Sequence, residues 1–142
     1  MIEIREREKD FWYTIYHWLN QDKEYLKNFG IDYISEDTIK DFWNTSKLFE
    51  IIRNNKPIGF IKLDLISFCG IFHIYLISEE RKKISNYFIL KKFLKICFKE
   101  YHFRNIYTYY KEKLKSNIFQ LEGEINNFYV YSVNKERCLY SQ

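Results

Sequence analysis

The chain has 142 residues, a length typical of one independently folding domain. Hydrophobic residues make up 46% and charged residues 30% of it, a composition that excludes an intrinsically disordered protein. Lysine and arginine number 23 against 19 aspartates and glutamates, and this net charge of +4 allows an anionic ligand without indicating nucleic acid. No apolar run approaches the roughly 18 residues that cross a membrane.

The cysteines indicate a reducing compartment. Cys69, Cys97 and Cys138 are odd in number and form no C-x-x-C pair, which disfavours a disulfide framework. No spacing of His, Cys, Asp or Glu suits a metal, and the charged start of the chain, MIEIREREKD, is no secretory signal. We therefore expect a cytoplasmic protein without a metal or a membrane segment, either a monomer or a homodimer.

The N-terminal part is predicted to be helical. From about Lys9 to Asn20, apolar side chains recur with the period of an amphipathic helix. Gly30 is the expected turn residue, and Ser35 is the expected N-cap of a short helix with Ile39 on its buried face. The chain is therefore expected to open with helices.

The middle of the chain changes to the pattern of strands. Leu48–Arg53 and Pro57–Ile66 are rich in Ile, Phe and Leu, and residues 54–56 (NNK) are typical of a hairpin turn. Gly70–Ile77 is a third strand, apolar on both faces, which predicts a central position in a sheet. Three strands joined by short turns indicate an antiparallel meander.

The C-terminal half begins with a long helix, from Ser85 to about Tyr101, followed by a strand over Arg104–Tyr109. A strand–helix–strand unit normally makes a parallel pair with a right-handed crossover. The remaining expected elements are a short helix near 111–116, strands near 119–124 and 128–132, and a last strand near 137–140. The order predicts a mixed α/β fold.

This order of elements, together with three short motifs, resembles the GNAT superfamily of acyl-CoA-dependent N-acyltransferases. Residues 55–61 (NKPIGFI) look like the family's hairpin with an Ile-Gly pair, and residues 16–20 (YHWLN) are similar to an element of its first helix. Residues 119–124 (FQLEGE) look like the F-x-x-E-G segment of the branch that holds ribosomal-protein N-terminal, amino-sugar and related acetyltransferases. The resemblance implies one GNAT-like domain over residues 1–142. Its sheet would be twisted and mostly antiparallel, with helices on both faces and a splayed parallel pair in the middle.

The resemblance also implies that acetyl-CoA is the acyl donor. Its pantetheine arm would pair with the backbone of the third strand, as an added peptide strand does. The residues concerned are Ile74, Tyr75, Leu76 and Ile77. Its pyrophosphate would lie at the start of the long helix, where backbone amides and the helix dipole attract anions.

The family writes the phosphate turn as R/Q-x-x-G-x-G/A, and this chain departs from that pattern. The matching residues are Arg81, Lys82, Lys83, Ile84, Ser85 and Asn86. Arg81 fits, but Ile84 and Asn86 replace small residues that let the backbone approach a phosphate closely. Three basic side chains favour a CoA site, while the stiff, β-branched Ile84 favours a basic turn that binds no nucleotide. Both readings stay open.

Transfer of an acyl group to an amine needs a base for the ammonium and an acid for the leaving thiolate. His73, Asp64 and Glu50 are the candidate bases, each on a predicted strand. The resemblance places the usual acid, a tyrosine, at Leu114, which has no proton to donate. The nearest hydroxyls are those of Tyr109, Tyr110 and Ser116.

The leading hypothesis is an acetyl-CoA-dependent N-acetyltransferase that acts by direct transfer on a primary amine. The acceptor would be an amino sugar, a similar small molecule or a peptide N-terminus. The alternative is a catalytically inactive GNAT-like binding module, which Ile84, Asn86 and Leu114 favour. A nucleic-acid-binding domain is disfavoured because the lysines of the long helix accompany no recognition motif.

Overall fold

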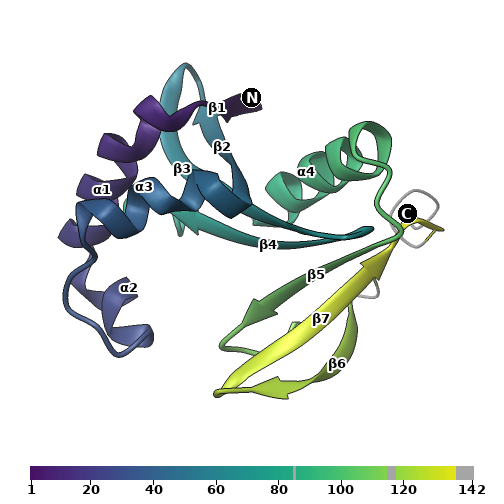
Figure 1. The fold of residues 1–142 in the computed structure, drawn as a ribbon. Helices are drawn as coiled ribbons and strands as arrows, with labels where there is room; N and C mark the ends of the chain where they lie inside the picture. Colours follow the sequence, from purple (N-terminus) through teal and green to yellow (C-terminus); the bar gives the residue numbers. More distant parts are fainter. Residues whose placement is uncertain (85, 115–117, 137–142) are drawn as a thin grey trace. The chain divides into compact units, whose positions relative to one another are not determined.

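A computed structural model describes residues 1–84, 86–114 and 118–136, except for the side chains of residues 86 and 134 (Figure 1). Seven strands form one sheet in the order β1-β2-β3-β4-β5-β7-β6. The strands are β1 (Ile2–Arg7), β2 (Ser46–Arg53), β3 (Lys56–Ile66), β4 (Cys69–Leu76), β5 (Asn105–Tyr110), β6 (Gln120–Ile125) and β7 (Phe128–Asn134). The helices are η1 (Lys9–Phe11), α1 (Trp12–Gln21), α2 (Lys23–Asn28), α3 (Glu36–Thr45) and α4 (Asn86–Glu100).

The sheet is mixed, as the sequence predicts. β4 and β5 run parallel, with pairs from Cys69–Asn105 to Ile71–Tyr107, whereas β1/β2, β5/β7 and β6/β7 are antiparallel. The mixed α/β fold with a mostly antiparallel sheet and one parallel pair is therefore confirmed. The divergence of the parallel strands beyond Ile71 stays a prediction.

The described residues group into two compact units. The first comprises residues 1–62 and 74–84, and the second comprises residues 63–73, 86–114 and 118–136. β3 and β4 contribute residues to both. The expectation of one domain over the whole chain stays a prediction.

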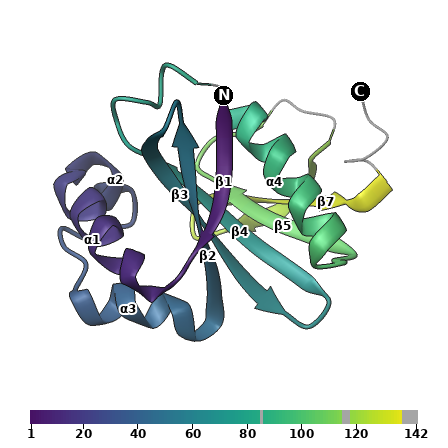
Figure 2. The ribbon, with the colours of Figure 1, turned by 90° about the horizontal axis from the view of Figure 1, so that it is seen from above.

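The core of the first unit forms where α1, α2 and α3 lie next to one another (Figure 2). Its fully buried members are Phe11, Ile15, Leu19, Ile39, Leu48, Phe60 and Tyr75. Ser35 begins α3 as predicted, because its Oγ accepts the Thr38 N–H at 3.2 Å. Gly30 has the positive φ of +71° expected of a turn residue.

The prediction that the chain opens with helices is wrong, because the first element is the strand β1. It pairs antiparallel with β2, from Ile2–Arg53 to Arg7–Leu48. β1 lies at one edge of the sheet, and charged side chains are typical of edge strands, where they discourage pairing with other molecules. Those charges hid the strand pattern. The short helix α2 was not predicted either.

The hairpin between β2 and β3 is confirmed. Asn54 and Asn55 have φ of +52° and +66°, as a tight hairpin turn requires. β3 begins one residue before Pro57.

In the second unit, α4 lies over the strands, with the ring of Phe93 5.5 Å from that of Phe72 (Figure 1). The long helix and the strands β5, β6 and β7 match their predictions within two residues. The predicted short helix is wrong over residues 111–114, which are not helical. Its remaining residues and the predicted strand at 137–140 lie outside the described residues.

No helix in the described part of the chain is long and apolar enough to cross a membrane. The described residues also contain no group of three or more His, Cys, Asp and Glu side chains that would hold a metal.

Candidate functional site

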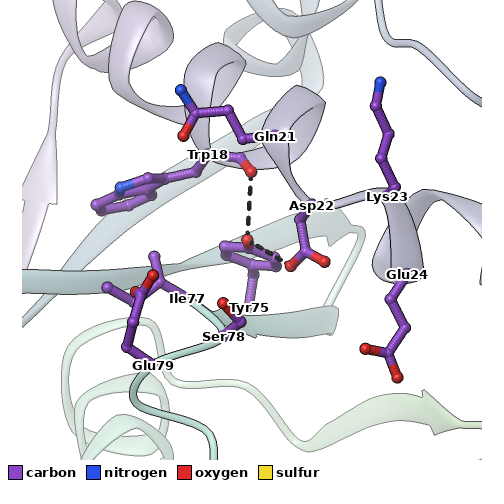
Figure 3. A pocket seen from close by; sticks show the side chains of 9 residues that line it. All are labelled: Trp18, Gln21, Asp22, Lys23, Glu24, Tyr75, Ile77, Ser78 and Glu79. Atoms are coloured by element: carbon purple, nitrogen blue, oxygen red, sulfur yellow. Dashed lines mark hydrogen bonds between the residues drawn. The ribbon is translucent and has the colours of Figure 1, made fainter.

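The first unit contains a pocket of about 530 Å³ (Figure 3). It lies where the end of α1, the start of α2 and the end of β4 meet. Its lining residues are Trp18, Gln21, Asp22, Lys23, Glu24, Tyr75, Ile77, Ser78 and Glu79. The lining thus combines two aromatic rings with three carboxylates against one ammonium group. Such a pocket suits an organic cation, since carboxylates and aromatic faces both attract positive charge.

Tyr75 forms the buried wall of this pocket. Its side chain is 2% exposed, and its ring stacks on Phe60 at 5.3 Å and meets Tyr25 edge-on at 4.9 Å. Its hydroxyl donates to Asp22 Oδ2 at 2.8 Å (Figure 3). Burial, and then this hydrogen bond, raise the pKa of Tyr75 far above its ordinary value. Tyr75 therefore keeps its proton and serves as a hydrogen-bond donor.

Asp22 joins the end of α1 to the start of α2. Its carboxylate caps α2 by accepting the Tyr25 N–H at 3.1 Å, and it also pairs with Arg81. Burial acts to raise the pKa of Asp22, but hydrogen bonds from Tyr75, Arg81 and the Tyr25 N–H together lower it below its usual range. Asp22 is therefore ionised at neutral pH and too weak a base to take a proton from an ammonium group.

The side chain of Arg81, expected at a phosphate, is turned toward the protein. Its Nε donates to Leu76 O at 2.9 Å, a terminal nitrogen pairs with Asp22, and the guanidinium lies 5.3 Å from the Tyr75 ring centre. The next two residues differ from Arg81. Lys82 is exposed, and the Lys83 side chain is 61% exposed, with its Nζ 3.6 Å from a carboxylate oxygen of Glu80.

Glu80, which the sequence analysis did not single out, holds the turn that follows β4. Its side chain is 1% exposed and accepts from Arg53 Nε at 2.8 Å. This hydrogen bond lowers the pKa of Glu80. The Glu80 carbonyl oxygen accepts the N–H groups of Lys83 at 3.1 Å and Ile84 at 3.3 Å. No local pattern signals this role, because Arg53 lies 27 residues earlier in the chain.

This turn meets the requirements of a phosphate site only in part. Two of its backbone N–H groups, those of Lys83 and Ile84, are already donated to Glu80. The lysine side chains still present positive charge to an anion. Ser85 lies outside the described residues, and Asn86 is the first residue of α4.

Steric crowding explains why the second residue of the Ile-Gly pair, Gly59, is a glycine. A Cβ on Gly59 would lie 2.1 Å from Tyr75 O, closer than any real Cβ contact. Ile77 N donates to Ile58 O at 2.9 Å across the same two strands. Gly59 thus lets β3 lie against the segment Ile74–Ile77, which was predicted to contact the acyl donor.

Of the candidate bases, Glu50 belongs to the first unit and is 5% exposed. Its carboxylate accepts from Arg7 at 2.8 Å, which provides a structural reason for its burial. His73 and Asp64 belong to the second unit. The His73 ring stacks on Tyr109 with centres 5.3 Å apart and planes at 14°.

The candidate acids Tyr109 and Tyr110 both retain their protons at neutral pH. Burial, and then the charge of Asp64, raise the pKa of Tyr109. Burial raises the pKa of Tyr110 to about 12, and the nearby Thr108 hydroxyl lowers it in part. Within the second unit, Tyr109 therefore interacts both with the His73 ring and with the charge of Asp64.

Leu114 occupies the position at which the resemblance places the usual acid. Its backbone N–H donates to the Tyr131 hydroxyl at 2.8 Å. Sequence reasoning did not identify Tyr131, which is 3% exposed, as a hydroxyl near this position. The sequence of β7 around Tyr131 contains no pattern that predicts this contact. Ser116 lies outside the described residues.

No protein-family model matches the sequence, and no curated protein does. Solved structures do match the fold. The spermidine N-acetyltransferase of Vibrio cholerae in complex with CoA and spermine has a TM-score of 0.72 and 16% identity, over 97% of this chain and 98% of that chain. Its dodecameric form in an intermediate state has a TM-score of 0.73 and 18% identity, over 99% and 98%. The PaiA N-acetyltransferase of Thermoplasma acidophilum in complex with coenzyme A has a TM-score of 0.68 and 18% identity, over 94% and 99%.

These matches span nearly the whole of each chain. The fold of this chain is therefore the GNAT fold of the N-acetyltransferases, and the expected fold class is confirmed.

Proposed function

We propose that the protein is an acetyl-CoA-dependent N-acetyltransferase that acts on a small primary amine. A fold alone does not decide function, so the site must carry the argument. The observation that carries it is the acidic, aromatic pocket on a GNAT fold. Glu24 and Glu79 supply negative charge there, because the charge of Asp22 is already paired with Arg81, and Trp18 supplies an aromatic face. These are the groups that recognise an ammonium ion.

For the donor, the proposal uses the segment Ile74–Ile77 and the lysines of the following turn. Backbone groups of a strand can pair with the two amides of pantetheine. Lys82 and Lys83 present positive charge that suits the phosphates of CoA. Lys83 and Ile84 donate their N–H groups within the turn, so the lysine side chains supply the attraction.

The proposed reaction is direct. The ammonium loses its proton to a base, the neutral nitrogen bonds to the acetyl carbon, and the C–S bond breaks. The nitrogen loses a second proton as the amide forms, and the thiolate of CoA leaves and takes up one proton, so that one proton is released overall. Within the second unit, His73 remains the candidate base and Tyr109 the candidate hydrogen-bond donor to a thiolate, because a phenol with a raised pKa holds its proton while it donates a hydrogen bond. The protein contributes chiefly by orienting the two substrates.

We propose a positively charged small molecule as the acceptor. The net charge of +4 disfavours a polycation at long range, but the local charge of the pocket is negative. Two of the three structural neighbours named above are structures of a spermidine N-acetyltransferase, one of them bound to spermine. Spermidine is therefore the first probe, glucosamine the second and a short peptide with a free N-terminus the third.

The test is to incubate the protein with acetyl-CoA and each probe and to measure the acetylated amine by mass spectrometry. Direct detection of the product avoids thiol reagents, which would react with the protein's own cysteines. The proposal expects acetylation of at least one probe. Glu79→Gln should raise KM for that amine, whereas Glu100→Gln, at the exposed end of α4, should not.

The second candidate is an inactive GNAT-like binding module. The N–H groups that Lys83 and Ile84 donate to Glu80, and the leucine at position 114, favour it. It predicts that no probe is acetylated even where acetyl-CoA binds. Acetylation of any probe would contradict it.

A further inference from the structure

Three donors from three parts of the chain converge on the carboxylate of Asp22. They are the Tyr25 N–H at the start of α2, the Tyr75 hydroxyl on β4 and the guanidinium of Arg81 in the turn after β4. The Asp22 side chain is 9% exposed. Burial strengthens charge-assisted hydrogen bonds, so this carboxylate is the point at which these segments are held together.

Arg81 uses two sides of its guanidinium at once. Nε donates to Leu76 O at 2.9 Å, while a terminal nitrogen pairs with Asp22. The guanidinium is rigid and planar, so these two contacts fix the path of the chain between Leu76 and Arg81. A lysine in this position has one nitrogen centre and cannot make both contacts in the same geometry.

The basic residues of this turn have two different roles, one structural and one in presenting charge to solvent. The donors of Arg81 face inward, toward Leu76 and Asp22. The side chains of Lys82 and Lys83 are exposed. The turn therefore has one arginine that shapes it and two lysines that carry its accessible charge.

We propose that Asp22 and Arg81 form a clasp that positions the turn of residues 78–84 for the acyl donor, so that Arg81 acts as a positioning residue while Lys82 and Lys83 meet the donor's phosphates. This inference rests on the proposed function. It assigns to Arg81 a role inside the protein in place of direct contact with phosphate. Asp22 then links the amine pocket, which it lines, to the turn on the donor side.

The experiment measures the Kd of acetyl-CoA by calorimetry for the wild type, Asp22→Asn, Arg81→Gln and the double variant. Each single change should weaken binding about tenfold, the equivalent of ~1.4 kcal/mol. The double variant should be no weaker than the poorer single variant, because both changes open the same clasp. Asp22→Glu should restore part of the affinity. Asp32→Asn and Arg5→Gln, at exposed positions of the first unit, are matched controls that should bind as the wild type does.

The salt dependence of binding separates positioning from contact with phosphate. Removing a charge that meets the ligand reduces the dependence of Kd on salt, because exposed charges are screened. Lys82→Gln and Lys83→Gln should reduce this dependence, and Arg81→Gln should leave it unchanged. Additive losses in the double variant, or a reduced salt dependence with Arg81→Gln, would overturn the proposal.

The two proposals fail in different ways. If the variants bind acetyl-CoA as the wild type does, the clasp has no positioning role, while the proposed function stands. If the folded wild type does not bind acetyl-CoA, the proposed function is wrong and the clasp has no donor to position. Circular dichroism of each variant shows that weaker binding does not reflect unfolding.

Discussion

The two units bury polar groups in different ways. In the first unit, buried or half-buried acids pair with arginines: Glu50 with Arg7, Glu80 with Arg53 and Asp22 with Arg81. In the second unit, the buried polar groups that the structure describes include neutral hydroxyls. Thr108 donates to Phe72 O at 2.9 Å, and the buried hydroxyl of Tyr110 has no hydrogen-bond partner among the described residues.

This difference separates two ways of fixing structure. The ion pairs of the first unit join residues 43, 27 and 59 positions apart, and each partner would be costly to bury alone. They specify which segments meet. The second unit contains packed pairs of large rings, such as Phe72 and Phe93, whose attraction does not depend on a charged partner.

The largest expected difference in the free energy of unfolding is between alanine substitutions at one glycine of each unit. Gly59→Ala should lower the free energy of unfolding by about 3 kcal/mol, because the new Cβ meets backbone that must move. Gly123→Ala should change it by less than about 0.5 kcal/mol, because nothing lies within 4 Å of the added atom. Urea unfolding of both variants measures the difference. Equal losses would show that the close approach of β3 to Tyr75 is not needed.

Removing the hydroxyl of a buried tyrosine should change stability in opposite directions in the two units. Tyr75→Phe removes a hydrogen bond to a charged group and should cost about 2 kcal/mol. Tyr110→Phe removes a buried hydroxyl without a partner among the described residues and should stabilise the protein by up to about 1 kcal/mol. Thermal and urea unfolding of the two variants test this. A loss of stability in Tyr110→Phe would contradict the contrast between the units.

The dependence of the free energy of unfolding on pH at the acidic end should reflect the ionisation of Asp22. Its pKa is lowered in the folded state, so its contribution is present above its unfolded pKa, about 4, and is lost as pH falls through the folded value. Asp22→Asn should therefore be least stable relative to the wild type at neutral pH, and the gap should shrink below about pH 4. Urea unfolding over this pH range measures the gap. A gap that is independent of pH would contradict an ionised, stabilising Asp22.

The smallest expected effect on stability is that of a substitution in the turn of residues 78–84. Ile84→Gly should cost about 0.5–1 kcal/mol of stability through added chain entropy. It should also tighten the binding of acetyl-CoA, because a glycine lets the backbone approach a phosphate. Calorimetry measures the affinity, with Ile31→Gly, at an exposed position of the first unit, as the control. Weaker binding would show that Ile84 supports the turn.

The fold was predictable where local patterns carry it. The periods of α1 and α4, the N-cap at Ser35 and the Asn54-Asn55 turn are local, and the structure confirms them. β1 was missed because an edge strand needs little apolar alternation. α2 was missed because its six residues are too few to show a helical period.

The candidate site was predictable only in part. Composition and spacing identified the segment from Ile74 to Asn86, but they could not show that Arg81 turns toward Asp22, 59 residues earlier. The same limit explains why Glu80 was missed, because its partner Arg53 lies on β2. Pairs between distant residues leave no trace in one sequence, whereas caps and turns do.

The most direct test of the account is the thermal unfolding of the wild-type protein with and without acetyl-CoA. At a concentration one hundred times the Kd, binding should add about 2.7 kcal/mol to the free energy of unfolding and raise Tm accordingly. The account predicts such a rise for acetyl-CoA and none for acetate at the same concentration. An unchanged Tm at millimolar acetyl-CoA would contradict an acetyl-CoA-dependent enzyme and leave only the fold.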